Sequence, residues 1–229
     1  MAKRRLKRYG GKLIFCQRDE WGLVEVIETA TTRSLHFGSP VEQSCLYFHA
    51  PFTLAHEYQE TLLDCVLQYA DQQPIQNLLL LGLGGGSLIT QLHPCLPATS
   101  FTAIELRPLV IEVAHTYFHL PQADNLHCIA KDACQFLAEN RTPYQVIVVD
   151  LYNESGMPEA LTDELFQQQL LQNLSSPGLM LMNLWQTTPH LTQPILHFWQ
   201  QQSRQRPELQ MRTFPIASSQ NLILQILLK

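Results

Sequence analysis

Short apolar runs recur along the chain from residue 77 onward, with segments of helical periodicity between them. Five runs have the length of buried strands: Leu78–Leu81, Phe101–Ile104, Leu126–Ile129, Val146–Val149 and Leu179–Met182. Their spacing of about 20 to 30 residues is typical of strands joined by crossover helices. The pattern therefore predicts a doubly wound, Rossmann-like α/β domain over residues 77–229, with five parallel strands.

Residues typical of helix starts lie between these runs. Pro108 suits the first turn of a helix, and Asp132 with Gln135 resembles a capping box. Thr162, which precedes two acidic residues, predicts a third helix start. Pro177–Gly178 predicts a plain turn before the fifth strand.

Two further apolar runs follow a helical segment that contains Trp199. These runs are Leu209–Thr213 and Leu222–Leu228. The linker between them is too short for a crossover helix, so they are expected to form an antiparallel hairpin at one edge of the sheet. The full prediction is a seven-stranded sheet, with five parallel strands and a C-terminal hairpin.

The chain before residue 77 has a different pattern. Four short β-rich pieces predict a small antiparallel β unit over residues 13–50: Leu13–Cys16, Leu23–Ile27, Ser34–Phe37 and Ser44–Phe48. Apolar residues at helical spacing from Leu54 to Tyr69 then predict a helix within a bridging segment, residues 51–76.

Composition narrows the class of protein. With 229 residues and 45% hydrophobic content, the chain can form one substantial core. No apolar run reaches transmembrane length and no signal-peptide pattern is present, so a soluble cytoplasmic protein with no membrane partner is expected. The six cysteines form no C-x-x-C pair, which predicts reduced thiols and neither a disulfide framework nor a zinc site.

Positive charge is concentrated at the N-terminus, although the formal net charge is −5. Six of the 15 basic residues are Lys3, Arg4, Arg5, Lys7, Arg8 and Lys12. Residues 1–12 are therefore predicted to be a basic flexible arm, which is either a solvated terminus or a contact for an acidic surface or nucleic acid. The rest of the chain is acidic and shows no alternation of basic and aromatic residues. Both features favour a solvated terminus and argue against binding of nucleic acid.

A glycine-rich turn, Gly82-Leu-Gly-Gly-Gly-Ser87, follows the first predicted strand. Glycine permits positive φ angles and lets the backbone approach a ligand closely. The N–H groups of the next helix would then face the crevice beyond the strand ends. A glycine run alone is also compatible with an ordinary loop.

Acidic residues follow the next three predicted strands and are expected at the same edge of the sheet. Glu105 lies about twenty residues beyond the glycines, where a carboxylate can accept both ribose hydroxyls; a solvated strand end is the alternative. Asp132 suits an adenine amino group, a helix cap or both. Asp150 follows a buried strand and suits a general base or a ligand for an ammonium group.

These residues bring a known family into view. The stretch from Leu78 to Trp185 resembles the spermidine synthase superfamily, the polyamine aminopropyltransferases and their relatives, which share the class I S-adenosylmethionine-dependent methyltransferase fold. The likeness is carried by Gly82–Ser87, Glu105, Asp132-Ala133, Asp150–Asn153, Gly156–Pro158 and Leu165-Phe166. The N-terminal β unit, with Gln43 before the bridging helix, also matches the family's layout.

The resemblance implies a site for S-adenosylmethionine or its decarboxylated form, without a metal. It implies that Gly82, Gly84 and Gly86 approach the methionine part, with Gly85 in the same turn. It places Glu105 at the ribose, Asp132 and Ala133 at the adenine, and Gln43 at the ligand from the lid side. Asp150 matches the aspartate that takes up the proton of the attacking amine.

The acceptor side departs from the family's pattern. Two aspartates that help hold ammonium groups in the family fall on Gly85 and Asn153, and Glu154 or Glu159 could substitute for them. The predicted acceptor-binding residues are Tyr58, Tyr152, Asn153 and Glu154. For both tyrosines a place in the hydrophobic core is the competing interpretation.

Three classes of function follow. The first is aminopropyl transfer to a small amine or another acceptor, with Asp150 as the proton acceptor. The second is methyl transfer on the same fold, and the third is a non-catalytic nucleotide-binding relative. An NAD enzyme fits less well, because the turn matches only the first two glycines of G-x-G-x-x-G. The resemblance also implies a homodimer, with the N-terminal β unit as a candidate contact.

Overall fold

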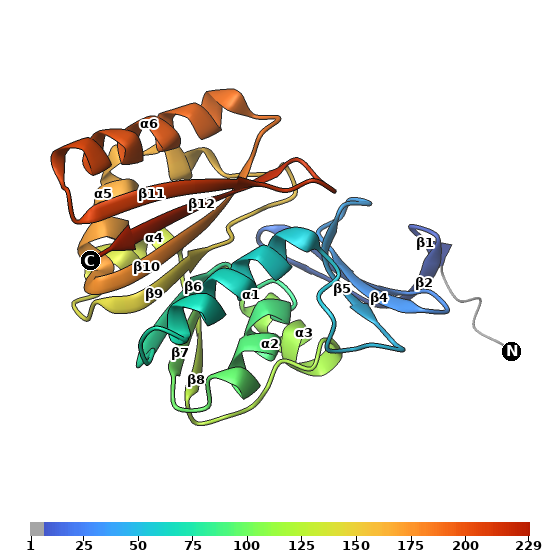
Figure 1. Ribbon diagram of the computed structural model, residues 1–229. Coiled ribbons are helices and arrows are strands. Elements are labelled where there is room, and N and C mark those ends of the chain that lie inside the picture. Colours follow the sequence, from blue (N-terminus) through green and yellow to red (C-terminus); the bar gives the residue numbers. More distant parts are fainter. Residues whose placement is uncertain (1–6) are drawn as a thin grey trace, which may run out of the picture.

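The computed structural model describes residues 7–229 and contains a large and a small β-sheet (Figure 1). The large sheet has the order β11-β12-β10-β9-β6-β7-β8. Its strands are β6 (Asn77–Leu81), β7 (Ser100–Glu105), β8 (Leu126–Ala130), β9 (Tyr144–Val149), β10 (Leu174–Trp185), β11 (Leu209–Pro215) and β12 (Asn221–Leu228). Strands β6 to β10 are parallel and β11–β12 is an antiparallel edge hairpin, which confirms the predicted seven-stranded sheet.

Helices cover both faces of this sheet. They are α1 (Glu57–Ala70), α2 (Ser87–Cys95), α3 (Pro108–Tyr117), α4 (Ala133–Glu139), the 3-10 helix η1 (Glu159–Thr162), α5 (Glu164–Asn173) and α6 (Pro189–Gln205). Residues of α1, α2 and α3 share one hydrophobic core, and residues of α4, α5 and α6 share a second. The opposite positions of α1 and α6 about the sheet are visible in Figure 1.

The leucines of β6 show why the sheet is buried on both faces. Leu78 and Leu80 belong to the core under α1–α3, whereas Leu79 and Leu81 belong to the core under α4–α6. Successive side chains of a strand point to opposite faces, so a continuous apolar run fills both cores. The interpretation of this run as a central buried strand is confirmed.

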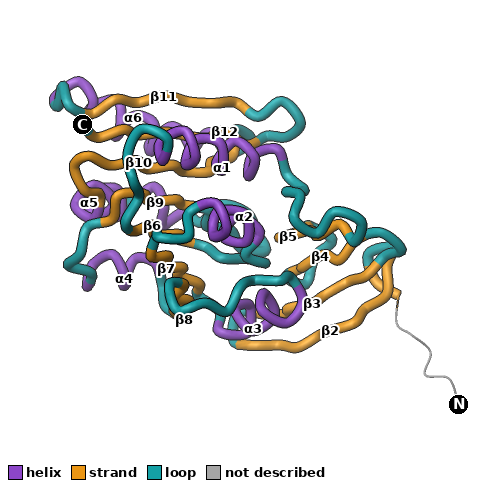
Figure 2. The backbone as a smooth tube through the Cα atoms, turned by 60° about the horizontal axis from the view of Figure 1, so that its bottom comes forward, coloured by secondary structure: helices purple, strands orange, loops and turns teal. Residues whose placement is uncertain are grey.

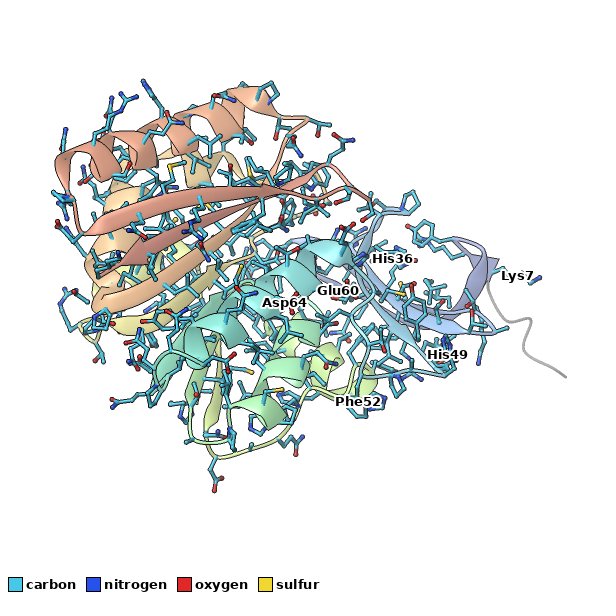
Figure 3. All side chains as sticks on the ribbon, viewed as in Figure 1. Lys7, His36, His49, Phe52, Glu60 and Asp64 are labelled. Atoms are coloured by element: carbon cyan, nitrogen blue, oxygen red, sulfur yellow. The ribbon has the colours of Figure 1, made fainter. Side chains whose placement is uncertain are left out.

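The small sheet is antiparallel and continuous in order from β1 to β5. Its strands are β1 (Lys7–Arg8), β2 (Gly11–Asp19), β3 (Gly22–Glu28), β4 (Thr32–His36) and β5 (Glu42–Tyr47). Lys7, Arg8 and Lys12 therefore lie in strands, with the exposed Lys7 pointing outward (Figure 3), although a flexible arm was predicted over residues 1–12. Lys3, Arg4 and Arg5 lie outside the described residues.

The small sheet packs against helix α3. Val24, Val26 and Leu35 pack in a third core with Val110 and Val113 of this helix, and the tube in Figure 2 shows α3 beside β3. Arg107 lies just before α3, and its guanidinium contacts the small sheet. Its Nε and Nη2 donate to the two carboxylate oxygens of Asp19 at 2.9 and 2.8 Å. Apolar packing and a paired charge thus fix the small sheet to the large domain.

Two boundaries differ from the prediction. Strand β10 already begins at Leu174, and Pro177–Gly178 lie within it, at a register irregularity, rather than in a turn before it. The N-cap of α5 is Asp163, whose carboxylate accepts from Leu165 N at 2.9 Å, because η1 occupies the segment up to Thr162. In contrast, Pro108 does begin α3.

None of the helices within residues 7–229 is both long enough and apolar enough to span a membrane.

Candidate active site

A cavity of about 840 Å³ opens where the carboxyl ends of β6, β7, β9 and β10 face β5 of the small sheet and the start of α1. Nearly all site residues expected from the sequence line it: Gln43, Tyr58, Gly82, Gly84, Glu105, Asp132, Ala133, Asp150, Tyr152, Asn153 and Glu154. Gly85 and Gly86 do not. Ligands of doubly wound sheets bind at this edge, so the topology places these residues where a ligand is expected.

Three glycines of the turn after β6 have positive φ angles: Gly82 at 91°, Gly84 at 53° and Gly86 at 76°. At Gly82 a Cβ atom would lie 2.1 Å from the carbonyl oxygen of Asp150, so only glycine lets the ends of β6 and β9 approach so closely. Gly86 is the N-cap of α2 in a left-handed conformation. The turn is therefore built for close backbone contact.

Gly85 lies on the back of the turn, against the small sheet. Its N–H donates to Ser44 Oγ at 2.8 Å, and a Cβ atom here would lie 2.8 Å from Ser44 Cβ and 3.1 Å from Phe118 Cγ. On this backbone the position has no room for the aspartate that the family carries there. The loss of that carboxylate is thus linked to the packing of β5 behind the turn.

Glu105, the last residue of β7, faces the glycine turn. Only 8% of the residue is exposed, so the alternative of a solvated strand end is wrong. Oε2 accepts from the N–H groups of Leu83 at 3.2 Å and Gly84 at 3.4 Å, and Oε1 accepts from Arg107 N at 3.1 Å. Burial raises the pKa of Glu105, and these donors oppose the rise. Contact with a ribose remains a prediction.

Asp132 caps α4, since its Oδ1 accepts from Gln135 N at 3.0 Å. The capping interpretation is therefore confirmed. Because Asp132 and the neighbouring Ala133 also line the cavity, the geometry is compatible with the predicted contact to adenine as well.

Asp150 follows β9 directly and has two side-chain donors. Asn183 Nδ2 donates to Oδ1 at 2.8 Å, and the hydroxyl of Tyr58 donates to Oδ2 at 3.3 Å. Burial raises the pKa of Asp150 to about 6, while both hydrogen bonds act to lower it. A carboxylate with a pKa near 6 is ionised at neutral pH and can still take up a proton, which is what a general base requires.

The two predicted acceptor-side tyrosines are half-buried and touch both the core and the cavity. Tyr58 stacks on His56 at 5.8 Å between ring centroids, and Tyr152 lies 5.4 Å from the ring of Trp185. Burial raises the pKa of each phenol, so both hydroxyls stay protonated at neutral pH and can act as donors.

The segment after Asp150 contains the second departure from the family. Asn153 closes a turn, because its Oδ1 accepts from Ser155 N at 2.8 Å. Of the two glutamates considered as substitutes for the absent carboxylate, Glu154 is exposed and lines the cavity, whereas Glu159 does not line it.

Several lining residues were not singled out as site residues from the sequence. Asn183 on β10 and Asn221 on β12 are buried, and Ser219 lies in the hairpin loop. A signal was present for Asn183, since it interrupts the apolar run from Leu179 to Leu184 of a central strand. Asn221 carries no comparable signal, because its partner becomes evident only with the register of β10 and β12.

The cavity is rich in carboxylates. Those that line it are Glu42, Glu57, Glu105, Asp132, Asp150 and Glu154. The lysine in the lining, Lys131, forms an ion pair with Glu139, and burial lowers the pKa of His56. Within residues 7–229 no group of three or more His, Cys, Asp and Glu side chains is arranged to hold a metal ion. A positively charged ligand would therefore meet a complementary lining.

Comparisons with known proteins identify relatives of this chain. The family model of the spermine/spermidine synthase domain matches residues 55–228. A polyamine aminopropyltransferase of Neisseria meningitidis is 32% identical over 163 residues, which cover 71% of this chain and 61% of that protein. The chain thus matches less than two thirds of that relative's length.

Solved structures show the same fold. A probable spermidine synthase from Corynebacterium glutamicum has a TM-score of 0.76 and 17% identity, and the match covers 92% of this chain and 78% of that chain. Human methyltransferase-like protein 13 in complex with SAH has a TM-score of 0.64 and 26% identity, with 76% and 83% covered. Because the family model covers most of the sequence, the chain belongs to the spermine/spermidine synthase family.

Proposed function

We propose that this protein transfers an aminopropyl group from decarboxylated S-adenosylmethionine to a small amine, with Asp150 as the proton acceptor. The observation that carries the proposal is the position of Asp150. Its carboxylate faces the cavity beside the glycine turn, with a pKa raised to about 6 and two hydrogen-bond donors that fix its orientation. The relative from Neisseria meningitidis supports the same class of reaction.

The residues around the glycine turn fit an S-adenosyl nucleotide. Gly82 and Gly84 line the cavity with positive φ angles, so their backbone can contact a ligand, and Glu105 lies directly beside them to receive hydroxyl groups. Asp132 and Ala133 would hold the base, and Gln43 would close the site from the small sheet. When bound, the nucleotide supplies a carbon that is activated by the positive charge on its sulfur.

The chemical demand on the protein is alignment and proton transfer. The acceptor amine must be neutral to attack; its nitrogen forms a bond to the activated carbon while the carbon–sulfur bond breaks and leaves a neutral thioether. The nitrogen then loses a proton to Asp150, which is ionised above a pH of about 6. Tyr58 and Tyr152 would line the path of the amine, and Glu154 would attract a distal ammonium group.

Mass spectrometry of products tests the proposal most directly. The protein is incubated with decarboxylated S-adenosylmethionine or S-adenosylmethionine and a panel of mono-, di- and polyamines. The expected product is an aminopropylated amine with release of methylthioadenosine, formed only with the decarboxylated nucleotide. Asp150→Asn should lower kcat by at least about 100-fold and leave nucleotide affinity nearly unchanged. An active variant would refute the role of Asp150.

Methyl transfer is the second candidate, and the packing at Gly85 favours it. With Ser44 behind the turn, the site lacks a carboxylate there to hold the aminopropyl ammonium group. The structural similarity to human methyltransferase-like protein 13 points the same way. Methylated products formed with S-adenosylmethionine would establish this alternative.

Binding without turnover would indicate the third class. Calorimetry that shows micromolar affinity for an S-adenosyl nucleotide, with no product from either nucleotide, would identify a non-catalytic relative. Light scattering tests the separate proposal that the protein is a homodimer with the small sheet as its contact.

A further inference from the structure

Asp150 lies at one end of a chain of hydrogen-bonded polar side chains, in which the two asparagines are buried and Ser219 is half-buried. Asn183 Nδ2 donates to Asp150 Oδ1 at 2.8 Å, and Asn221 Nδ2 donates to Asn183 Oδ1 at 2.8 Å. Ser219 Oγ, at the hairpin loop, donates to Asn221 Oδ1 at 2.6 Å. Every hydrogen bond in this chain therefore points from the loop toward the carboxylate.

The direction of the chain fixes both amides. If Asn183 were flipped, its oxygen would face the carboxylate of Asp150 and its NH₂ group would face that of Asn221. The NH₂ group of Asn221 faces the oxygen of Asn183, which leaves the Asn221 oxygen to accept from the hydroxyl of Ser219. The carboxylate can only accept and so orients both amides, and Asn221 on the neighbouring strand holds the oxygen of Asn183 so that its NH₂ group stays on Asp150.

Asn183 is a buried polar residue in an apolar row of β10. It is 1% exposed and continues the row of Leu179 and Leu181, which belong to the core under α1–α3. A leucine would extend that apolar row, whereas a buried amide costs stability unless its hydrogen bonds are made. The position thus carries a polar group where the packing alone calls for an apolar one.

We propose that Asn183 and Asn221 are positioning residues that orient the carboxylate of Asp150 and keep it ionised at neutral pH. This inference rests on the proposed function of Asp150. The amide occupies Oδ1, so Oδ2, which receives only the weaker bond from Tyr58, is the oxygen left for the incoming proton. The hairpin β11–β12 then acts as part of the site, because it supplies Asn221 and Ser219.

The groups that face Asp150 determine how a change in its pKa can be measured. The titratable side chains that face it are the phenols of Tyr58 on α1 and Tyr152 after β9, and both stay protonated near neutral pH. From β10 the facing group is the uncharged amide of Asn183, and from β6 it is the backbone of Gly82. Glu105 and His56 line the same cavity and burial shifts their pKa values too, so a titration near pH 6 is assigned to this carboxylate by its loss in Asp150→Asn.

The variants are Asn183→Leu and Asn221→Leu, with Asn173→Leu as a matched control. Asn173 is also a buried asparagine, but its amide donates to Leu137 O and Gln169 O, away from the cavity. Carbon-13 NMR of labelled aspartate, assigned with Asp150→Asn, follows the pKa without any need for turnover. The pH profile of kcat follows it in the working enzyme.

Loss of a hydrogen bond to the charged form should raise the pKa of Asp150 by about one unit in Asn183→Leu and by less in Asn221→Leu. The acidic limb of the kcat profile should move by the same amounts, with KM for the nucleotide unchanged. Asn173→Leu should shift neither.

An unchanged pKa in both cavity variants would overturn the inference and leave only a structural role for the amides. Should Asn183→Leu not fold, Asn221→Leu decides alone. A shifted pKa without product formation would preserve the positioning role while refuting the proposed transfer reaction.

Discussion

At the scale of single residues, the buried environment that raises the pKa of Asp150 also lowers the stability of the folded protein at neutral pH. Its pKa lies above the ordinary value because the carboxylate is largely removed from water. Between about pH 4 and 6 the native state consequently binds more protons at this site than the unfolded state does. The contribution of Asp150 to stability therefore falls as the pH rises through this range, and the folded protein is penalised at neutral pH.

The first prediction is that Asp150→Asn stabilises the protein at pH 7.5 while it abolishes turnover. The free energy of unfolding should rise by about 1–3 kcal/mol relative to the wild type, because an uncharged amide carries no penalty for burial of charge. The difference should shrink steadily as the pH falls from about 6 to 4, because the wild-type carboxylate then becomes protonated in the native state. Urea denaturation of both proteins from pH 4 to 8 measures it, and equal stability at all pH values would contradict the raised pKa.

The second prediction concerns the missing carboxylate of the glycine turn. Gly85→Asp would place a Cβ atom 2.8 Å from Ser44 Cβ, so the turn or β5 must move. Overpacking of this kind costs about 1–3 kcal/mol. We expect a lower melting temperature and weaker nucleotide binding for the single variant.

Replacement of Ser44 tests this explanation. Ser44→Gly alone should have a small effect on nucleotide binding, whereas Ser44→Gly with Gly85→Asp should recover most of the stability lost in Gly85→Asp. Thermal unfolding of the four proteins forms a double-mutant cycle. If the double variant is as unstable as the sum of the two single variants, Ser44 does not determine what the position accepts.

At the scale of elements, one buried ion pair couples the small sheet to the helix that carries it. Arg107 is 4% exposed, and its guanidinium holds both carboxylate oxygens of Asp19 while it lies 4.6 Å from the ring of Phe37. Removal of one partner leaves a buried charge without a counterion, which costs more than the pair itself contributes.

The third prediction is that Asp19→Asn destabilises the protein by about 2–4 kcal/mol and loosens the small sheet, which the apolar core with α3 still holds. Amide hydrogen exchange should accelerate in β2 and β3, which the ion pair between Arg107 and Asp19 holds in place. It should remain slow in β6 and β9, which do not depend on this ion pair. Glu139→Gln is the control, since it removes the partner of Lys131 in a pair with an exposed carboxylate and should cost less than about 1 kcal/mol. Equal effects of the two variants would refute the coupling.

Some elements of the fold follow directly from the sequence and others do not. Strands β6 and β9 were predictable because both of their faces are buried, so their sequences are continuous apolar runs. The start of β10 was not, because residues 175–177 are typical of a turn and lie in the register irregularity between the pairs Leu174–Tyr144 and Leu179–Val146.

Site residues that lie at the end of a strand or directly after it were predictable, as at Glu105 and Asp150. The amide chain of Asn183, Asn221 and Ser219 was not, since two antiparallel strands bring together residues that are distant in sequence. Local pattern indicates which face of a strand is buried, but it does not give the partner of each residue on a strand that is distant in sequence.

At the scale of the whole molecule, negative charge accumulates where the ligand is expected. The formal net charge is −5, and the cavity is lined by carboxylates from the small sheet, α1, the strand ends and the loop after β9. These groups come from elements that meet only in the folded protein. Their fields add within the cavity and fall off with the Debye length, which shrinks from about 10 Å at 0.1 M salt to about 3 Å at 1 M.

The fourth prediction is that salt weakens binding of the amine acceptor but not of a neutral nucleoside. Between about 0.1 M and 1 M sodium chloride, the Kd of a diamine should rise at least about threefold, because screening reduces its attraction to Glu42, Glu57 and Glu154 at the cavity rim. Methylthioadenosine carries no charge, so its Kd should stay nearly constant. Calorimetry in both salts measures the two ligands on the same protein.

Variants that replace a glutamate with glutamine separate the electrostatic attraction of the cavity carboxylates from general effects of salt. Glu154→Gln should reduce the salt dependence of diamine binding, whereas Glu139→Gln, whose glutamate does not line the cavity, should leave it unchanged. A diamine affinity that is independent of salt in the wild type would mean that the carboxylates are not met by a cationic acceptor. The acceptor would then have to be sought among uncharged molecules, while the nucleotide half of the site would stand unaltered.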